Sequence, residues 1–251
     1  MQMHGNTIFI TGGSSGIGCA LAEAFHRRGN HIIISGRRED RLKEICARHS
    51  GMAYFVLDVT DPNSIRSVAQ KVTADFPALN SVFNNAGVQM RAGMSADGSL
   101  DEHSLETEIT TNLFAPIRVA AAFLPHLAKQ AGGTLVNVSS GLAFVPIARF
   151  PVYCATKAAI HSWTMTLRYQ WQKLGVKVIE LIPPYVGTEL GGPRKQAMNP
   201  GPQPMPLDAF IAETMKELES DADEIAIADA KKLFAATSPE SVKRIFGFMN
   251  G

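Results

Sequence analysis

Short runs of β-branched and apolar residues alternate with longer helical patterns along most of this chain, and this alternation constrains its fold most strongly. Six of the runs are expected to be strands: 7–11, 31–35, 53–58, 79–84, 134–139 and 177–182. They are almost continuously apolar, which is typical of parallel strands that are covered on both faces. Helices are expected over 17–28, 39–49, 61–75, 104–130 and 152–173. The repeated order of strand and helix predicts an α/β fold with a doubly wound parallel sheet and helices on both faces.

The length and composition fit a single domain that spans residues 1–251. With 45% hydrophobic and 19% charged residues, the chain has enough apolar side chains to form a core. The segment 183–206 is rich in proline and glycine, and too little chain follows it for a second core, so we expect a loop. Residues 183–223 as a whole are expected to form a substrate loop or lid. The tail predicts a helix at 207–220, an edge strand at 224–229 and a final helical stretch.

Charge and cysteine content exclude several classes of protein. The formal net charge is +1, so no basic surplus favours nucleic acid or an anionic membrane as a partner. Cys19, Cys46 and Cys154 are widely spaced and include no C-x-x-C pair, which indicates reduced thiols. Neither a signal peptide nor a membrane-spanning apolar run is visible. We therefore expect a cytoplasmic protein.

A glycine-rich turn, "TGGSSGIG" at residues 11–18, follows the first expected strand directly. A turn of this kind places free backbone N–H groups and the positive end of a helix dipole beside an anion. Glycines allow the close approach of a pyrophosphate or of the next strand. The alternative is a tight strand-to-helix turn without a ligand. Six residues of the turn are the expected contacts of a dinucleotide: Gly12, Ser14, Ser15, Gly16, Ile17 and Gly18.

The end of the second strand indicates which dinucleotide is preferred. Gly36 stands where such folds commonly place an acid that binds the adenosine ribose, and Arg37 and Arg38 follow it. Arginine suits a 2′-phosphate, so NADP(H) is favoured and NAD(H) remains the alternative. The two arginines could instead begin a solvated helix and pair with the acids at 39–40.

Asp58 ends the third expected strand and has two interpretations. Its carboxylate could accept a hydrogen bond from the adenine amino group, with Val59 as a neighbouring cofactor contact. It could equally cap the following helix, although Asp61 is better placed for that role.

Tyr153 and Lys157 lie four residues apart on an expected helix, so both can reach one ligand. A phenol has a reference pKa of about 10 and is a poor base near neutrality, whereas a nearby ammonium lowers that pKa. The alternative is an ordinary surface tyrosine and lysine.

With TGxxxGxG, "NNAG" at 84–87 and Tyr-x-x-x-Lys in this order, the chain resembles the short-chain dehydrogenase/reductase family over roughly residues 5–190. The resemblance implies a Rossmann-type sheet. It implies that the segment 84–87, which includes Asn84, stabilises the sheet and passes the cofactor, and it assigns two sets of residues. Those beside the cofactor are Asn85, Ala86 and Gly87, and the active-site residues are Asn112, Ser140, Tyr153 and Lys157.

The family mechanism that follows assigns a role to each active-site residue. Hydride passes from NADPH to a carbonyl carbon while Tyr153 protonates the oxygen, and Ser140 hydrogen-bonds that oxygen. Lys157 would hold the nicotinamide ribose and lower the pKa of the tyrosine. Asn112, through water, would connect Lys157 to solvent as a proton relay.

Two departures from the family pattern stand out. In "PPYVGT", Pro184 replaces the usual glycine, although Pro183, Val186 and Thr188 still lie where they could bind the carboxamide. The C-terminal segment does not show the strand and Gly-Gly turn that build a second contact between subunits. A homodimer through the long helices is therefore favoured over a homotetramer.

Seven residues on loops after the fourth, fifth and sixth strands are candidates to line a substrate pocket: Met90, Leu142, Phe144, Phe150, Tyr185, Met198 and Met205. They favour a moderately hydrophobic ketone, aldehyde or alcohol, although each could merely pack its loop. The histidines show no short metal-ligand spacing, so no metal is assigned. A non-catalytic dinucleotide sensor and a nucleotide-sugar epimerase remain alternatives, but the first tends to lose the serine, tyrosine and lysine, and the second generally needs a larger C-terminal domain.

Overall fold

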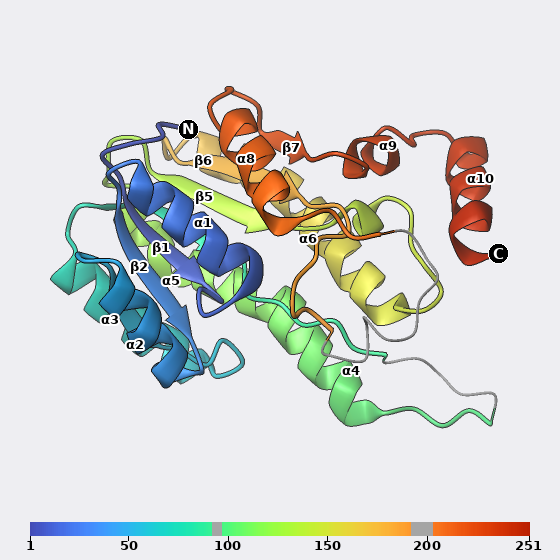
Figure 1. Ribbon diagram of the computed structural model, residues 1–251, viewed down its shortest axis with the longest axis horizontal. Coiled ribbons are helices and arrows are strands. Elements are labelled where there is room, and N and C mark those ends of the chain that lie inside the picture. Colours follow the sequence, from blue (N-terminus) through green and yellow to red (C-terminus); the bar gives the residue numbers. More distant parts are fainter. Residues whose placement is uncertain (92–96, 192–202) are drawn as a thin grey trace.

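The computed structural model describes residues 1–91, 97–191 and 203–251. In this part of the chain, seven parallel strands form one sheet in the order β3-β2-β1-β4-β5-β6-β7 (Figure 1). The strands are β1 Thr7–Thr11, β2 His31–Gly36, β3 Ala53–Val56, β4 Leu79–Asn84, β5 Thr134–Val138, β6 Lys177–Ile182 and β7 Glu224–Ala226. The strand order reverses between β1 and β4, which confirms the doubly wound, Rossmann-type sheet.

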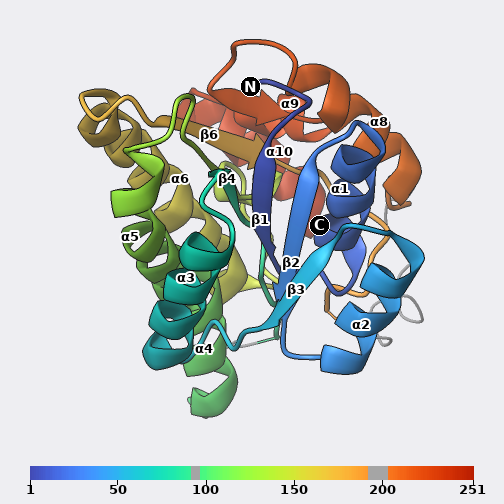
Figure 2. The same cartoon turned by 90° about the vertical axis from the view of Figure 1, so that its left-hand side faces the viewer.

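Helices cover both faces of the sheet. They are α1 Gly16–Arg27, α2 Glu39–Arg48, α3 Pro62–Asp75, α4 Glu102–Ile109, α5 Ala115–Leu127, α6 Pro151–Gln172, α8 Leu207–Glu217, α9 Ala230–Phe234 and α10 Pro239–Asn250. Figure 2 shows α3, α5 and α6 on one face, and α1, α2 and α8 on the other. The described residues include no helix that is long and apolar enough to cross a membrane.

The side chains of β1 are buried on both faces of the sheet, which explains why its sequence shows no alternation of apolar and polar positions. Ile8 and Ile10 pack with Phe25 in the core cluster on the α1 side of the sheet. Phe9 points to the opposite face, where its ring centroid lies 4.9 Å from that of Phe123. Full burial of such a side chain is worth about 1.5–3 kcal/mol. Both faces of the central strands are therefore apolar.

The helix expected over 104–130 is interrupted. A π-helical turn at Thr110–Phe114 lies between α4 and α5, and such turns are frequent at functional sites. The third strand ends at Val56, two residues earlier than expected. Asp61 caps α3 through the N–H of Asn63 at 2.8 Å, so a capping role for Asp58 is wrong.

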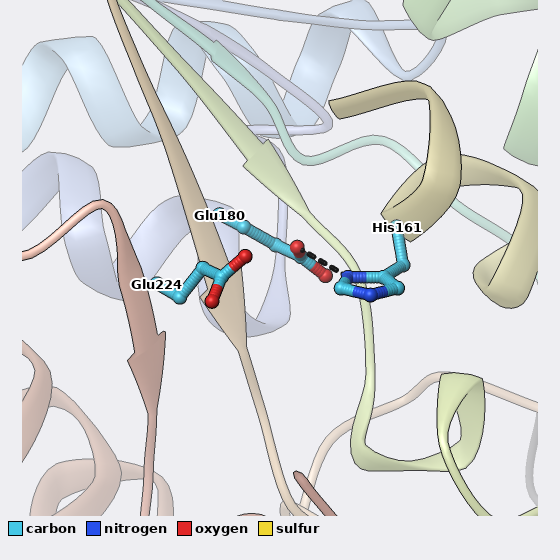
Figure 3. A group of neighbouring side chains, drawn as sticks. All are labelled: His161, Glu180 and Glu224. Atoms are coloured by element: carbon cyan, nitrogen blue, oxygen red, sulfur yellow. Dashed lines mark hydrogen bonds and ion pairs between the residues drawn. The ribbon is translucent and has the colours of Figure 1, made fainter. Parts of the chain in front are cut away.

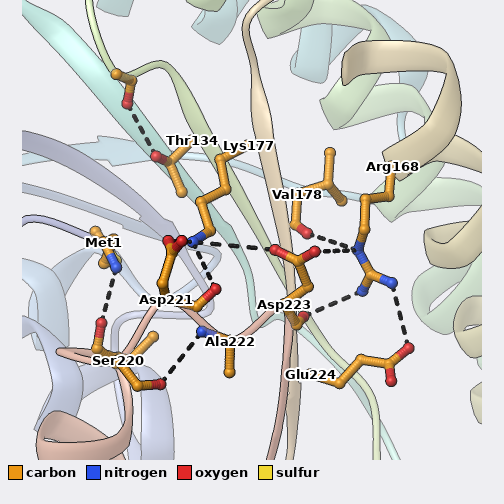
Figure 4. Close-up of polar contacts among 12 residues, drawn as sticks. Met1, Thr134, Arg168, Lys177, Val178, Ser220, Asp221, Ala222, Asp223 and Glu224 are labelled. Atoms are coloured by element: carbon orange, nitrogen blue, oxygen red, sulfur yellow. Dashed lines mark hydrogen bonds and ion pairs between the residues drawn. The ribbon is translucent and has the colours of Figure 1, made fainter.

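The edge strand β7 is tied to its neighbours by charged side chains (Figure 4). Arg168 of α6 donates to the carbonyl oxygen of Val178 at 3.1 Å and pairs with Glu224 at 3.2 Å. Lys177 pairs with Asp221 just before the strand. These contacts anchor the tail. Its expected edge strand is confirmed by the pairing of β7 with β6, although the strand ends at Ala226, three residues earlier than expected.

The described residues on either side of the undescribed segment after β6 pack against the rest of the protein. Val186 forms an isolated bridge with Met205. Within α8, Phe210 and Met215 are buried in the core cluster shared with α1. The expected loop or lid region therefore contains a packed helix.

Candidate active site

The glycine-rich turn lies against the segment that follows β4. The hydroxyl of Thr11 accepts the backbone N–H groups of Asn85 at 3.0 Å and Ala86 at 3.1 Å. Gly12 has a φ of +69°, and a Cβ there would lie 2.8 Å from the Cα of Ala86. A Cβ on Gly18 would overlap the side-chain nitrogen of Asn85. Both glycines are therefore required by close packing of the two motifs.

Arg38 reaches over the same turn from the start of α2. Its Nη2 atom lies 2.7 Å from the hydroxyl oxygen of Ser15 and 3.3 Å from that of Ser14. Its Nη1 atom pairs with Glu189 at 3.4 Å. A Cβ on Gly36 would lie 3.3 Å from the hydroxyl oxygen of Ser14. The absence of a side chain at Gly36 thus leaves room beside the arginine.

The neighbours of Asp58 stabilise the ionised form of its side chain. Its Oδ1 atom accepts the backbone N–H of Thr60 at 2.9 Å and the Thr60 hydroxyl at 2.7 Å. Partial burial raises the pKa of Asp58, but these hydrogen bonds and the Arg37 guanidinium outweigh burial, so the pKa lies below its ordinary value. Val59 packs partly buried against the core next to it.

The segment after β6 passes over the start of α1. A Cβ on Gly16 would lie 3.4 Å from the Cβ of Thr188. The carbonyl oxygen of Pro183 accepts the backbone N–H of Gly141 at 3.0 Å. Val186 is buried. The three residues expected to bind the carboxamide therefore connect the ends of β5 and β6 with the glycine-rich turn.

Asn112 is buried in the π-helical turn. Its Oδ1 atom accepts the N–H of Val88 at 2.9 Å, and its Nδ2 atom donates to the carbonyl oxygen of Val88 at 2.8 Å. A Cβ on Gly87 would lie 3.3 Å from the Oδ1 atom of Asn112 and 3.9 Å from the Nζ atom of Lys157. The structure thus brings Asn112 and Lys157 close to the same glycine.

Ser140 and Tyr153 meet at the end of β5. Ser140 has an extended backbone, and its Oγ atom accepts the N–H of Leu142 at 3.1 Å. Burial raises the pKa of the Tyr153 phenol well above its ordinary value, and a hydrogen bond with Ser140 lowers it only in part. The Nζ atom of Lys157 lies 5.7 Å from the centre of the tyrosine ring. The expected lowering of the tyrosine pKa by Lys157 is therefore wrong for this arrangement, in which burial dominates.

Lys157 itself is deeply buried. Its Nζ atom donates to the carbonyl oxygen of Val138 at 2.8 Å. Burial lowers the pKa of Lys157 to about 8, against the opposing charges of Glu180 and Glu108. The ammonium is thus close to losing its proton in the neutral range.

Glu108 and Glu180 were missed by motif analysis. Glu108 lies one helical turn before Asn112, is fully buried, and accepts the N–H of Met90 at 2.8 Å. Its Oε2 atom has no partner among the described residues, and burial raises its pKa. Glu180 lies in the middle of the apolar strand β6. The acid within "KVIELI" was the available signal for Glu180.

The candidate pocket residues have different surroundings. Phe144 packs against the rings of His161, at 4.6 Å, and Phe234, at 5.1 Å, which favours a packing role. Phe150 is buried and Tyr185 is exposed. The others with described positions are Met90, Leu142 and Met205, which are partly buried. Met198 lies outside the described residues.

Comparisons with known proteins agree with this arrangement. A family model described as short chain dehydrogenase matches residues 6–199. The uncharacterized oxidoreductase DltE of Bacillus subtilis is 43% identical over 190 residues, which cover 76% of this chain and 75% of that protein. A fatty acyl-CoA reductase of Acinetobacter baylyi is 31% identical over 199 residues, which cover 77% of this chain and 67% of the reductase.

Solved structures show the same fold. A short-chain dehydrogenase from Burkholderia cenocepacia in complex with NADP has a TM-score of 0.83 at 24% identity, with 99% of both chains covered. A short-chain dehydrogenase from Sphingobium yanoikuyae in complex with NADPH has a TM-score of 0.75 at 28% identity, with 88% of this chain and 86% of that chain covered. Since the family model spans most of the sequence, this chain belongs to the short-chain dehydrogenase family of oxidoreductases.

Proposed function

We propose that this protein is an NADP(H)-dependent oxidoreductase that acts on a carbonyl or secondary alcohol of a small, moderately hydrophobic substrate. The observation that carries the proposal is the convergence of Ser140, Tyr153 and Lys157 beside Gly87, next to the glycine-rich turn. NADP(H) supplies or accepts the hydride when bound. The single chain, residues 1–251, would provide both the cofactor site and the catalytic site.

The glycine-rich turn fits a dinucleotide. At Gly12 and Gly18 a side chain would collide with neighbouring protein atoms, so glycine at these positions lets the turn pack closely against the segment after β4. Ser15, at the N-terminus of α1, makes no side-chain hydrogen bond to the helix, which leaves the first N–H groups available for phosphate oxygens. Arg38 would bind the 2′-phosphate with Arg37 nearby, which favours NADP(H) over NAD(H). The NADPH complex of the Sphingobium relative supports this preference.

Further residues would hold the rest of the cofactor. Asp58 and Val59 are proposed at the adenine, and the segment 85–87 beside the nicotinamide ribose. The carboxamide would lie at Pro183, Val186 and Thr188, the residues between β6 and the undescribed segment. Residues 183–223 would then cover the substrate.

Tyr153 is proposed as the general acid of carbonyl reduction. Burial keeps its phenol protonated, which is the state an acid needs. Ser140 would donate a hydrogen bond to the same substrate oxygen and stabilise the charge that develops there. Lys157 would bind the nicotinamide ribose through its ammonium, and Asn112 would complete a proton relay to solvent through water.

The assembly is proposed to be a homodimer through the helices α5 and α6. Three large apolar side chains on or next to these helices are exposed: Phe114 just before α5, and Met165 and Tyr169 on α6. Burial of such side chains against a second copy would remove their apolar area from water. A homotetramer remains the alternative assembly.

The function is tested by following NADPH and NADH oxidation by the purified protein with a panel of ketones and aldehydes. The panel includes long aliphatic aldehydes because one relative is a fatty acyl-CoA reductase. NADPH consumption with at least one apolar carbonyl is expected. A preference for NADH would support an NAD-dependent alcohol dehydrogenase, and tight cofactor binding without turnover would support a dinucleotide sensor.

A further inference from the structure

Glu180 of β6 is a buried acid close to the proposed catalytic residues. The Oε1 atom of Glu180 accepts the hydroxyl of Ser139 at 2.5 Å, and its Oε2 atom lies 2.8 Å from the Nδ1 atom of His161. Figure 3 shows the imidazole of His161 directed at this carboxylate, with Glu224 on the other side. The Glu180 side chain is completely buried. Burial of a carboxylate costs free energy unless nearby donors or cations balance its charge.

The carboxylates of Glu180 and Glu224 already have hydrogen-bonding or ion-pair partners within the protein. One possible ligand atom each from His161, Glu180 and Glu224 lies within 4.8 Å of the other two. However, both oxygens of Glu180 accept hydrogen bonds, and Glu224 pairs with Arg168 at 3.2 Å. The arrangement is therefore an ion-pair network rather than a site that lacks a cation.

The network adjoins Lys157. Tyr153, Lys157 and His161 follow one another at intervals of four on α6, so their side chains share one face of the helix. Ser139, which holds Glu180, directly precedes Ser140 in the chain. The charge of Glu180 acts on Lys157 in favour of the ammonium. Among the described residues, the ammonium donates to the carbonyl oxygen of Val138, which is neutral and cannot balance its charge.

We propose that Glu180, held in place by Ser139 and His161, is a positioning residue that keeps the buried Lys157 side chain in its ammonium form. This inference rests on the proposed function, in which Lys157 must carry a positive charge.

The sign of the effect follows from the groups around Lys157. These are the charges of Glu108 of α4 and Glu180 of β6, together with Tyr153, Cys154 and His161, which lie within about one turn of Lys157 on α6. Burial lowers the pKa of Lys157 to about 8, while Glu180 and Glu108 raise it. The hydrogen bond with Glu180 raises the pKa of His161, whose positive form in turn offsets part of the charge of Glu180. Removal of the Glu180 charge should therefore lower the pKa of Lys157 further.

The first experiment follows the titration of Lys157 without substrate. The protein is labelled with ¹³C at lysine Cε, and the Lys157 signal is assigned by its loss in Lys157→Arg. In Glu180→Gln, whose amide can still accept from Ser139, the midpoint should move down by about one pH unit. His161→Gln, which keeps a hydrogen-bond donor but removes the ring charge, should not lower it. Glu213→Gln, the same change on α8, should have no effect.

The second readout is the pH dependence of carbonyl reduction. In Glu180→Gln the falling alkaline limb of kcat/KM should move to lower pH by the same amount, with activity retained in acid. An unmoved Lys157 midpoint would overturn the inference, and so would a uniform loss of kcat without a shift of the limb. Since the NMR titration needs no substrate, failure of the proposed reductase function would leave that test intact. Urea unfolding of each variant separates loss of folding from loss of charge.

Discussion

The guanidinium of Arg38 lies 2.7 Å from the hydroxyl oxygen of Ser15, so a cation from the end of β2 covers the glycine-rich turn that follows β1. The two adjoining arginines are thereby distinguished. Arg38 contacts the turn, whereas Arg37 acts on the charge of Asp58.

Arg38→Ala should weaken NADPH binding by about tenfold to 100-fold, because charge-assisted hydrogen bonds to a phosphate are worth about 1.5–3 kcal/mol. NADH binding should change little, since NADH lacks the 2′-phosphate. Fluorescence titration with both cofactors measures the difference. Arg41→Ala is the matched control, since the ion pair of Arg41 among the described residues is with Glu189, at 4.0 Å, and not with the glycine-rich turn. Equal loss of affinity for both cofactors would contradict a 2′-phosphate role.

Gly18→Ala should destabilise the protein and weaken cofactor binding. The added Cβ would overlap the side chain of Asn85 and lie 2.5 Å from the carbonyl oxygen of Gly12. Overpacking of this kind costs about 1–3 kcal/mol, measured as the free energy of unfolding in urea. Gly247→Ala in α10 is the control, because that Cβ meets no atom of the described residues within 4 Å and helix propensity favours alanine by up to about 1 kcal/mol. Equal stabilities of the two variants would argue against tight packing of the turn.

The rate of carbonyl reduction should fall as the pH rises through about 8. Tyr153 must be protonated to act as an acid, and because burial raises its pKa, it stays protonated well above that pH. The proposed mechanism requires Lys157 in its charged form, and burial lowers its pKa to about 8, so its loss of a proton comes first. The alkaline limb of kcat/KM reports the free enzyme, which is the state with these pKa values. A limb that appears only at about pH 10 or above would show that Lys157 does not limit the reaction.

Tyr169→Glu should weaken the proposed dimer. The side chain is 75% exposed on α6, near Met165, and a charge there would have to be desolvated in the interface. Light scattering after size exclusion should show a shift towards monomer at low micromolar concentration. Phe248→Glu is the control, since Phe248 is 89% exposed on α10, which is not one of the two helices of the proposed interface. An unchanged mass in both variants would show that the interface does not include Tyr169.

Local patterns were sufficient to predict the sheet. The apolar runs of β1 and β2 are buried on both faces, so their composition alone indicated parallel strands. The motifs at 11–18 and 84–87 are held together by Thr11, which explains why they predicted one site. The π-helical turn was not predictable, because the residues at 110–114 show no break in helical pattern.

The functional details that the sequence could not supply depend on long-range packing. Which of two adjacent arginines covers the turn depends on the backbone at the start of α2. Phe144 acquires its packing partner Phe234 from α9, ninety residues later in the chain. The pKa of Tyr153 is dominated by burial, which motif spacing does not encode. These properties emerge only when distant segments come together.

The most direct test of the central claim is the Tyr153→Phe variant, which removes only the phenol oxygen from a buried ring. NADPH binding should stay close to that of the wild type, while kcat for reduction of the best carbonyl substrate should fall by about 100-fold or more, because the general acid is lost. Retained turnover in Tyr153→Phe would contradict the assignment of Tyr153 as the acid and with it the proposed mechanism.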